Sequence, residues 1–471
     1  MPRQLTRRSL LIGVGALRAQ TVFRESITGR VILPGDADYH SARRVFSFNP
    51  QTDKYPRMIV RCAEPEDAAK AVLYAREKQL DAAVRSGGHD LLGASVCDGL
   101  VIDLSRMNAI RMDRDARTVR VEAGARAAAL NRATQASELA VPLGCHPGVG
   151  VAGLTLGGGI GWLTGKHGAT CDNLLGADVV TADGKMVHAS ATENSDLFWA
   201  IRGGGGNFGI VTALEYQLHP VSQVIGGVIA YRSGLDKFLR FYSSFMKDAP
   251  AELAVELNIR LNAQPTIIAM VCWSGDQAEG QRVLRPLRSF GPPEKDLVDT
   301  VAYLHLLDRF PQLGRLLGPP PPRDRKGPPN IYWRGGSLPA LTNSAADQLS
   351  TIAQEAPPDS SIGVGHYMHG QVCRVAQDAT PLPRIAGQFT YFINGSWYER
   401  SSAEASMAWV DGSWTAMQRH SSKGTYINYL SADDAAAVKA SYGKNFARLA
   451  ELKRKYDPAN FFHHNRNIRL N

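Results

Sequence analysis

The hexapeptide Arg85-Ser86-Gly87-Gly88-His89-Asp90 joins two apolar segments of this chain through a pair of adjacent glycines. The composition of the flanks predicts a strand at 82–84 and another at 100–104. Glycine has no Cβ and a free φ, so the backbone of the loop can pass close to a phosphate. Successive N–H groups in such a turn form a concave anion site. A plain glycine turn with an incidental histidine is the alternative interpretation.

The segments around this loop predict an α+β unit rather than a regular alternation of strands and helices. A helix is expected at 65–80, where Pro65 can occupy the first turn and apolar residues share one face. A second helix is expected at 127–139. The run 118–124 alternates apolar and polar residues, which predicts a strand.

A longer glycine-rich stretch follows, with seven glycines between residues 148 and 161. Such a density indicates a backbone that approaches a large ligand, or very tight packing. A further glycine loop at 203–209 lies between a short helical turn at 196–201 and a strand at 210–218. Residues 204–209 match G-x-G-x-x-G, but a nicotinamide fingerprint needs the order strand, loop, helix. The observed order disfavours a nicotinamide-dependent dehydrogenase.

The character of the chain changes after Val221, where strands and helices predict one sheet with helices on one side. The expected strands are 223–231, 257–261, 266–273, 362–368 and 388–394. The expected helices are 236–246, 277–290, 344–353 and 403–419, with a last helix at 435–455. A proline-rich run at 318–329 is expected to be an exposed linker.

Composition limits the possible partners of the chain. Its 471 residues are 44% hydrophobic and 21% charged, as in a soluble protein with two or three domains. The formal charge is +9, but no lysine and arginine run is interleaved with aromatic residues, so nucleic acid is not an expected partner. Six scattered cysteines without a C-x-x-C predict neither a zinc site nor a disulfide framework. No spacing of candidate ligands predicts a metal site.

The first 25 residues resemble a twin-arginine export signal. Arg7 and Arg8 precede a short apolar run and small residues, so we expect an exported, periplasmic protein. The alternative is a basic tail on a cytoplasmic protein. The apolar run is far shorter than the roughly 18 residues of a spanning helix, and no membrane partner is expected.

Four stretches together resemble the berberine-bridge-enzyme-like flavin oxidases of the vanillyl-alcohol-oxidase superfamily. They are RSGGHD at 85–90, VGVAGLTLGGGIGWLTGKHGATCDNLLGADVVTADG at 149–184, DLFWAIRGGGGNFGIVT at 196–212, and YINYL followed by YDPANFFHHNRNI at the end. The resemblance covers the chain from about residue 30 to 471. It implies an α+β fold with a two-part p-cresol-methylhydroxylase (PCMH) type of FAD domain. The FAD domain is expected at 26–220, an inserted substrate domain with an antiparallel sheet at 221–420, and a return to the FAD side at 421–471.

The same resemblance assigns roles to individual residues. His89 stands where family members bond the flavin covalently through a histidine. His146 stands where other members use a cysteine for a second bond. Cys145 lies one place away, so single attachment is expected. Tyr429 is the second tyrosine of Y-x-N-Y and is the expected catalytic base, the alternative being a structural tyrosine. Val149 stands at the position that gates oxygen, and its small side chain favours an oxidase.

Further residues are expected to line the FAD. Arg85, Ser86, Gly87 and Gly88 would cradle the pyrophosphate through backbone N–H groups. The remaining lining positions are Val149, Gly150, Gly153, Gly157, Gly158, Gly161, Gly206, Gly209, Ile210, Val211, Asn465 and Asn467.

The implied reaction moves hydride from a carbon that bears O–H or N–H to covalently bound FAD, and O2 reoxidises the flavin to give hydrogen peroxide. The substrate is expected to be a small sugar, alcohol or amine. Tyr367, Tyr391 and Trp397 are compatible with all three. A flavin dehydrogenase with another electron acceptor is one alternative, and a catalytically idle binding protein on the same fold is another.

Overall fold

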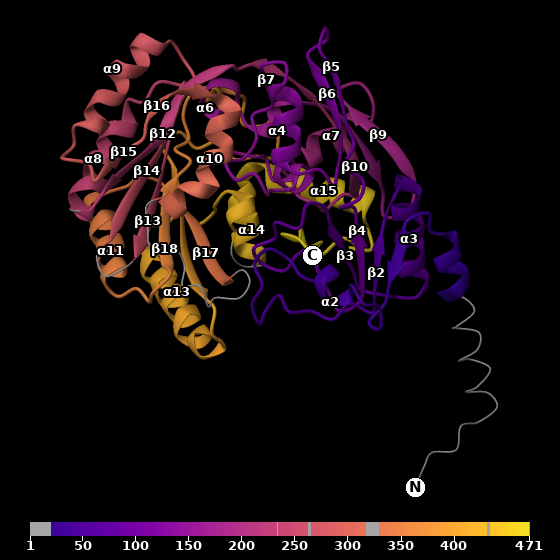
Figure 1. The fold of residues 1–471 in the computed structure, drawn as a ribbon. Helices are drawn as coiled ribbons and strands as arrows, with labels where there is room; N and C mark the ends of the chain where they lie inside the picture. The colour runs from indigo at the N-terminus through magenta and orange to yellow at the C-terminus, as the bar shows by residue number, and fades with distance from the viewer. Residues whose placement is uncertain (1–19, 233, 262–264, 317–328, 431–433, 471) are drawn as a thin grey trace.

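The computed structural model describes residues 20–232, 234–261, 265–316, 329–430 and 434–470. Most of the predicted export signal, and nearly all of the proline-rich run, lie outside the described residues. Two halves lie side by side in Figure 1, and the yellow C-terminal helices sit with the indigo and purple half. Among the described residues, no helix combines the length and the apolar character needed to cross a bilayer.

The first half begins with a four-stranded sheet of order β1-β2-β4-β3. Its strands are β1 (Arg30–Ile32), β2 (Met58–Arg61), β4 (Leu100–Asp103) and β3 (Ala82–Arg85). Helix α3 (Pro65–Glu77) buries small residues such as Ala68 and Ala71. Strands β3 and β4 are parallel, with Arg85 opposite Asp103. The glycine loop therefore leaves the sheet at the carboxyl edge of these strands.

A second, five-stranded antiparallel sheet of order β5-β6-β10-β8-β9 completes this half. Its strands are β5 (Ile110–Asp113), β6 (Thr118–Glu122), β10 (Ile210–Gln217), β8 (Leu174–Val180) and β9 (Met186–Ser190). The helices of this region are α4 (Ala127–Gln135), α5 (Val151–Leu156), α6 (Thr164–His167) and α7 (Ser195–Ile201). Helix α5 begins within the glycine-rich stretch, where the sequence reading predicted no helix.

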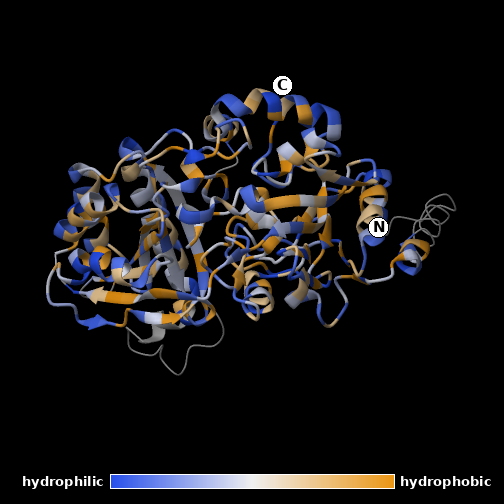
Figure 2. Ribbon diagram, turned by 90° about the horizontal axis from the view of Figure 1, so that it is seen from above, coloured by the Kyte–Doolittle hydropathy of each residue, from blue (hydrophilic) through white to orange (hydrophobic). Residues whose placement is uncertain are grey.

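The second half is built on an eight-stranded antiparallel sheet. Its strands are β15 (Lys295–Asp296), β12 (Gln223–Tyr231), β14 (Thr266–Trp273), β13 (Leu253–Leu261), β18 (Ser360–Gly365), β19 (Phe389–Trp397) and β17 (Asn330–Leu338), with β16 (Asp299–Ala302) also paired to β12. One face packs into a core with α8 (Leu235–Lys247), α9 (Gln277–Arg288), α11 (Asn343–Gln354) and α13 (Ala403–Met417). Helices around the sheet of this half carry both hydrophobic and hydrophilic residues in Figure 2.

The α+β class and the antiparallel sheet with a helical layer are confirmed, with one addition. Helix α10 (Tyr303–Leu316) was not expected, and it packs beside Val224, Val228 and Ile268 on the opposite face of the sheet. Strand β17 was also missed, because the proline-rich run before it masked its pattern.

The C-terminal segment packs back into the core of the first half. Leu449 of α15 (Phe446–Tyr456) and Val438 of α14 (Ala435–Tyr442) join the same apolar cluster as the first two sheets. The single helix expected at 435–455 was wrong. The chain breaks at Gly443, whose φ of +53° lies in the left-handed region that glycine tolerates.

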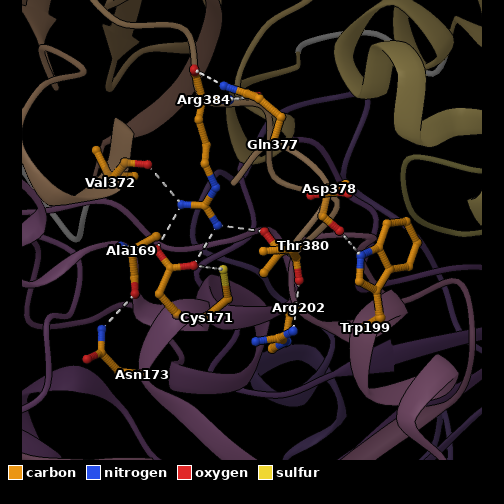
Figure 3. Close-up of polar contacts among 12 residues, drawn as sticks. Ala169, Cys171, Asn173, Trp199, Arg202, Val372, Gln377, Asp378, Thr380 and Arg384 are labelled. Carbon is orange, nitrogen blue, oxygen red and sulfur yellow. Dashed lines mark hydrogen bonds and ion pairs between the residues drawn. The ribbon is translucent and has the colours of Figure 1, made fainter. Parts of the chain in front are cut away.

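A buried ion pair links the two halves. Arg384, from the second half, donates to both oxygens of Asp172 at 2.8 and 2.5 Å. Nearby, the indole of Trp199 donates to the carbonyl of Asp378 at 2.7 Å (Figure 3). A paired charge and a hydrogen-bonded indole N–H therefore lie where the halves meet.

Candidate active site

The glycine loop after β3 is held by its own side chains. The buried guanidinium of Arg85 donates to Asp103 at 2.9 Å, so this side chain stabilises the sheet edge. The hydroxyl of Ser86 donates to the carbonyl of Ala123 at 2.5 Å. A Cβ on Gly87 would come within 2.4 Å of Cα of Gly150. The two glycine loops therefore touch backbone to backbone, and only glycine permits this approach.

His89 lies at the edge of this contact, between two aromatic rings. Its ring stacks on Phe46 with centroids 3.9 Å apart, and the ring of His146 lies 4.7 Å away. Burial, His146 and Arg126 together lower the pKa of His89 to about 3. The imidazole is therefore neutral near pH 7, with one ring nitrogen carrying a lone pair.

Several buried polar atoms near the glycine loops have no partner within the described part of the chain. They are the side-chain oxygens of Asn465 and Asn467 and the hydroxyl of Tyr442. The Asn465 amide donates to the carbonyl of Gly206 at 3.0 Å, which places this group beside the 203–209 loop. A buried polar atom without a partner is costly, so these atoms fit a bound polar molecule.

Gly153 adds a second sign of a bound group. It lies in α5, and a Cβ there would meet no atom of the described segments within 4 Å. Glycine costs a helix roughly 1 kcal/mol relative to alanine, so its presence beside open space favours an approaching ligand. These features fit an extended dinucleotide such as FAD, with the phosphates near bare backbone N–H groups.

Other predicted cofactor positions serve the packing of the protein itself. A Cβ on Gly157, Gly158, Gly161 or Gly209 would collide respectively with Asn428, Leu382, the carbonyl of Leu143 and Val179. Ile210 and Val211 are buried at the start of β10. Gly88 has a φ of +71°, in the left-handed region that favours glycine. Val149 is half-buried, and its carbonyl accepts from Ala127 at 2.9 Å. Contact of these residues with the cofactor stays a prediction.

Tyr429 ends a line of hydrogen bonds that joins both halves. Its hydroxyl lies 3.0 Å from Nε2 of His366, and Nδ1 of His366 lies 2.8 Å from Oε1 of Glu256. The thiol of Cys145 donates to the same carboxylate oxygen at 2.9 Å. Tyr429 lies in a 3₁₀ turn (Ile427–Tyr429), Glu256 in β13, and His366 directly after β18. His366 has a φ of +43°, a conformation that costs energy in a residue other than glycine.

The electrostatics of this line keep the phenol protonated. Burial, followed by Glu256, Cys145 and Tyr426, raises the pKa of Tyr429 well above its usual value. Burial also opposes ionisation of Glu256, but His366 and Cys145 outweigh it and hold the pKa of Glu256 below its ordinary range. Because the Glu256 carboxylate can only accept, it holds the N–H at Nδ1 of His366, and Nε2 faces the hydroxyl of Tyr429.

Aromatic rings flank Tyr429, although two of the expected ones face elsewhere. The rings of Trp333 and Tyr429 pack edge to face, with centroids 5.6 Å apart, and the ring centroid of Phe392 lies 6.3 Å from that of Trp333. Tyr391 and Trp397 are instead buried in the core under the helical layer, because they alternate with Phe392 along β19. They were therefore wrong as candidate substrate contacts.

Sequence reasoning missed Glu256, Trp333 and the pairing of His366 with Tyr429. Glu256 occupies a polar position in the alternating strand β13, which was the available signal. Trp333 lies in the unpredicted strand β17.

Tyr426 and Asn428 stabilise the glycine-rich stretch. Tyr426 accepts from the Gly159 amide at 3.0 Å, and Asn428 donates to the Leu154 carbonyl at 3.1 Å.

Comparison with known proteins agrees with this geometry. One family model, described as an FAD binding domain, matches residues 56–190, and another, described as berberine and berberine like, matches residues 425–469. An uncharacterised FAD-linked oxidoreductase of Bacillus subtilis is 31% identical and covers 94% of this chain and 98% of its own. The (R)-6-hydroxynicotine oxidase of Paenarthrobacter nicotinovorans is 30% identical, with coverage of 94% and 97%.

Comparison with solved structures shows that the fold also resembles that of a known oxidase. The crystal structure of 6-hydroxy-D-nicotine oxidase from Arthrobacter nicotinovorans aligns with a TM-score of 0.84 at 26% identity. The alignment covers 95% of this chain and 99% of that one. Sequence and fold agree over nearly the whole length, so the chain belongs to the berberine-bridge-enzyme-like FAD-linked oxidoreductases.

Proposed function

We propose that this FAD-linked oxidoreductase is an oxidase that removes hydride from a C–OH or C–NH carbon of a small molecule, with Tyr429 as the catalytic base. The observation that carries the proposal is the line from Tyr429 through His366 to Glu256, with steps of 3.0 and 2.8 Å. A phenol hydrogen-bonded to an imidazole, itself backed by a carboxylate, is arranged to take a proton and pass it on.

The residues of the chain divide the work as follows. The bound flavin supplies the hydride acceptor. The oxygen of Tyr429 takes the proton from the substrate O–H or N–H, while its own proton passes to Nε2 of His366. Glu256 stabilises the resulting imidazolium through its contact with Nδ1. Because the pKa of Tyr429 is raised, the phenol needs His366 to act as a base near neutral pH.

His89 would carry the FAD through a covalent bond. Its ring lies beside the contact between Gly87 and Gly150, and its lowered pKa keeps a nitrogen free of its proton. A second bond from Cys145 is disfavoured, since that thiol donates to Glu256 and His146 lies beside His89 instead.

Oxygen is the proposed electron acceptor. The small side chain of Val149 at the gating position and the oxidase activity named for a relative support hydrogen peroxide as product. A flavin dehydrogenase with another acceptor is the second candidate. Trp333 and Phe392 favour a substrate with an apolar or ring-shaped face, such as an aromatic alcohol, a cyclic amine or a sugar. Export by the twin-arginine route belongs to this proposal as well.

Two measurements on purified full-length protein test it. Mass spectrometry of a tryptic digest is expected to find the His89 peptide heavier by one FAD. Alcohols, amines and sugars are then screened for anaerobic bleaching of the flavin and for peroxide release in air. Bleaching without peroxide would favour the dehydrogenase, and a flavin that no substrate class reduces would reject the enzymatic role.

A further inference from the structure

Three side chains of the types that bind metals, Asp81, His463 and His464, form a cluster at the surface. Asp81 precedes β3, while His463 and His464 belong to the C-terminal segment. Nε2 of His463 lies 3.0 Å from Oδ1 of Asp81, and Nε2 of His464 lies 2.6 Å from Oδ2. The three ligand atoms all lie within 4.8 Å of one another.

The hydrogen bonds of His463 fix where its proton sits. Its Nδ1 lies 3.1 Å from the carbonyl oxygens of both Asn460 and Phe461. A carbonyl can only accept, so Nδ1 carries the hydrogen, and in the neutral ring Nε2 then carries a lone pair. That lone pair faces a carboxylate oxygen, so two acceptors oppose each other. A cation that both atoms bind, lying beside the pair, makes this arrangement favourable.

We propose that Asp81, His463 and His464 bind one divalent cation of the zinc class. Nε2 of each imidazole and the carboxylate are ligands of the kind that Zn²⁺ prefers, and ligands at its usual bond lengths lie roughly 3.4 Å apart in a tetrahedron. The carbonyl bonds to Nδ1 of His463 are the outer partners that orient a ligating histidine. The side chains are 42%, 27% and 44% exposed for His463, His464 and Asp81, so the ion can enter and keep a water ligand.

The position of the cluster indicates that a bound ion would stabilise the structure around the proposed cofactor site. Asp81 lies immediately before the strand that ends at the His89 loop, and the two histidines immediately precede the segment with Asn465 and Asn467. An ion here connects the segment before β3 with the C-terminal segment, and both segments lead into the proposed cofactor site. Sequence spacing did not predict the site, because Asp81 lies 383 positions from His464.

Another cluster, formed by Cys145, Glu256 and His366, also satisfies the distance condition for a metal. It is assigned no metal here, because Glu256 and His366 form the line to Tyr429 on which the proposed function rests, and Cys145 donates to that line. It serves as an internal control.

The test is calorimetric titration of chelator-treated, full-length flavoprotein with zinc chloride at pH 7.5. One zinc per chain is expected. Asp81→Asn, His463→Asn and His464→Asn should each weaken binding at least tenfold. His366→Asn, in the other cluster, and His420→Asn, a histidine remote in sequence, should bind as the wild type does. Zinc should also raise the Tm of the wild type more than that of the three ligand variants.

The opposite results would overturn the proposal. If the wild type binds no stoichiometric zinc, the cluster consists of direct contacts between the two histidines and Asp81, and it is not a metal site. If Asp81→Asn and His464→Asn retain wild-type affinity, the zinc lies elsewhere. If only His366→Asn loses binding, the metal belongs to the active-site cluster. Each readout is independent of turnover, so it does not depend on the proposed function.

Discussion

Arg384 and Asp172, which are 212 positions apart in the sequence, form a bidentate ion pair with N–O distances of 2.8 and 2.5 Å. The same guanidinium donates to the carbonyl of Val372 at 3.1 Å and to the hydroxyl of Thr380 at 2.6 Å. The Arg384 side chain is fully buried. Removing it leaves Asp172 charged and unpaired at the junction of the two halves.

Arg384→Met should therefore lower the free energy of unfolding by roughly 3–5 kcal/mol, the usual cost of breaking a buried pair. Arg240→Met is the matched control, because the Arg240–Asp347 pair is exposed. Exposed pairs contribute at most about 1 kcal/mol. Urea denaturation followed by tryptophan fluorescence compares the two. Equal losses in both variants would mean that the Arg384 contact adds nothing beyond a surface pair.

The sequence predicted the parts of the fold that depend on neighbours along the chain. The alternation in 118–124, the apolar run at 266–273 and the glycine loops at 85–90 and 203–209 are local signals, and strands or turns form there. The break at Gly443 was missed, because a glycine inside an apolar pattern is compatible with either a helix or its end.

The active site was harder to predict, because its contacts join distant segments. The role of Tyr429 was predicted from a family resemblance. Its partner His366 lies 63 positions away in sequence, so no local pattern connects the two residues. Glu256 comes from a third segment, and pairing of β13 with β18 brings it next to His366. No local pattern encodes such a line. The same limit hid the cluster of Asp81 with His463 and His464.

Tyr429→Phe should slow flavin reduction by roughly 10²–10⁴-fold, since it removes the proposed base. Folding and flavin content should stay normal, because the ring is kept. Tyr426→Phe is the control: its hydroxyl is buried nearby but accepts from the Gly159 amide. It should lose about 1 kcal/mol of stability and little of the reduction rate. Anaerobic stopped-flow reduction measures both variants, and equal rates in the two would remove Tyr429 as the base.

His366→Asn tests whether His366 acts through Tyr429. Without the imidazole, the proton acceptor is a phenol whose pKa burial raises well above its usual value. The rate of flavin reduction should fall at neutral pH and recover as the pH rises, whereas the apparent substrate affinity should change little. An unchanged pH profile with weaker substrate binding would indicate a substrate contact instead.

Gly153→Val should block the cofactor without disturbing the protein around it. A Cβ at this position would meet no atom of the described residues within 4 Å, and the two methyl groups of valine extend from that Cβ. Flavin content should therefore drop sharply, while the flavin-free protein keeps its secondary structure. Gly412→Ala is the comparison, because Gly412 also faces open space, on the exposed side of α13. It should gain up to about 1 kcal/mol of stability and keep its flavin. Absorbance at 450 nm per chain measures the flavin content, and full loading of Gly153→Val would place the cofactor elsewhere.

The stacked pair His167 and His219 should make stability fall in mild acid. Their ring centroids lie 4.1 Å apart, and burial, His219 and Lys166 lower the pKa of His167 to about 4. Burial and Lys166 also lower the pKa of His219. The unfolded chain binds protons at these histidines below about pH 6.5, whereas the folded pair stays neutral until lower pH. The stabilisation is therefore complete above about pH 6.5 and is lost as the pH falls toward 4.

A double variant, His167→Gln with His219→Gln, removes this titration and should flatten the fall in Tm between pH 7 and 4.5. The glutamine at 219 can keep the hydrogen bond that His219 makes with Asn173 at 2.6 Å, so the fold is retained. The exposed His40→Gln is the control and should leave the wild-type slope unchanged. If the double variant loses Tm with acid as steeply as the wild type, other groups govern the acid response. The buried carboxylate of Asp103 would then be the next group to test, because its pairing with Arg85 outweighs burial and lowers its pKa.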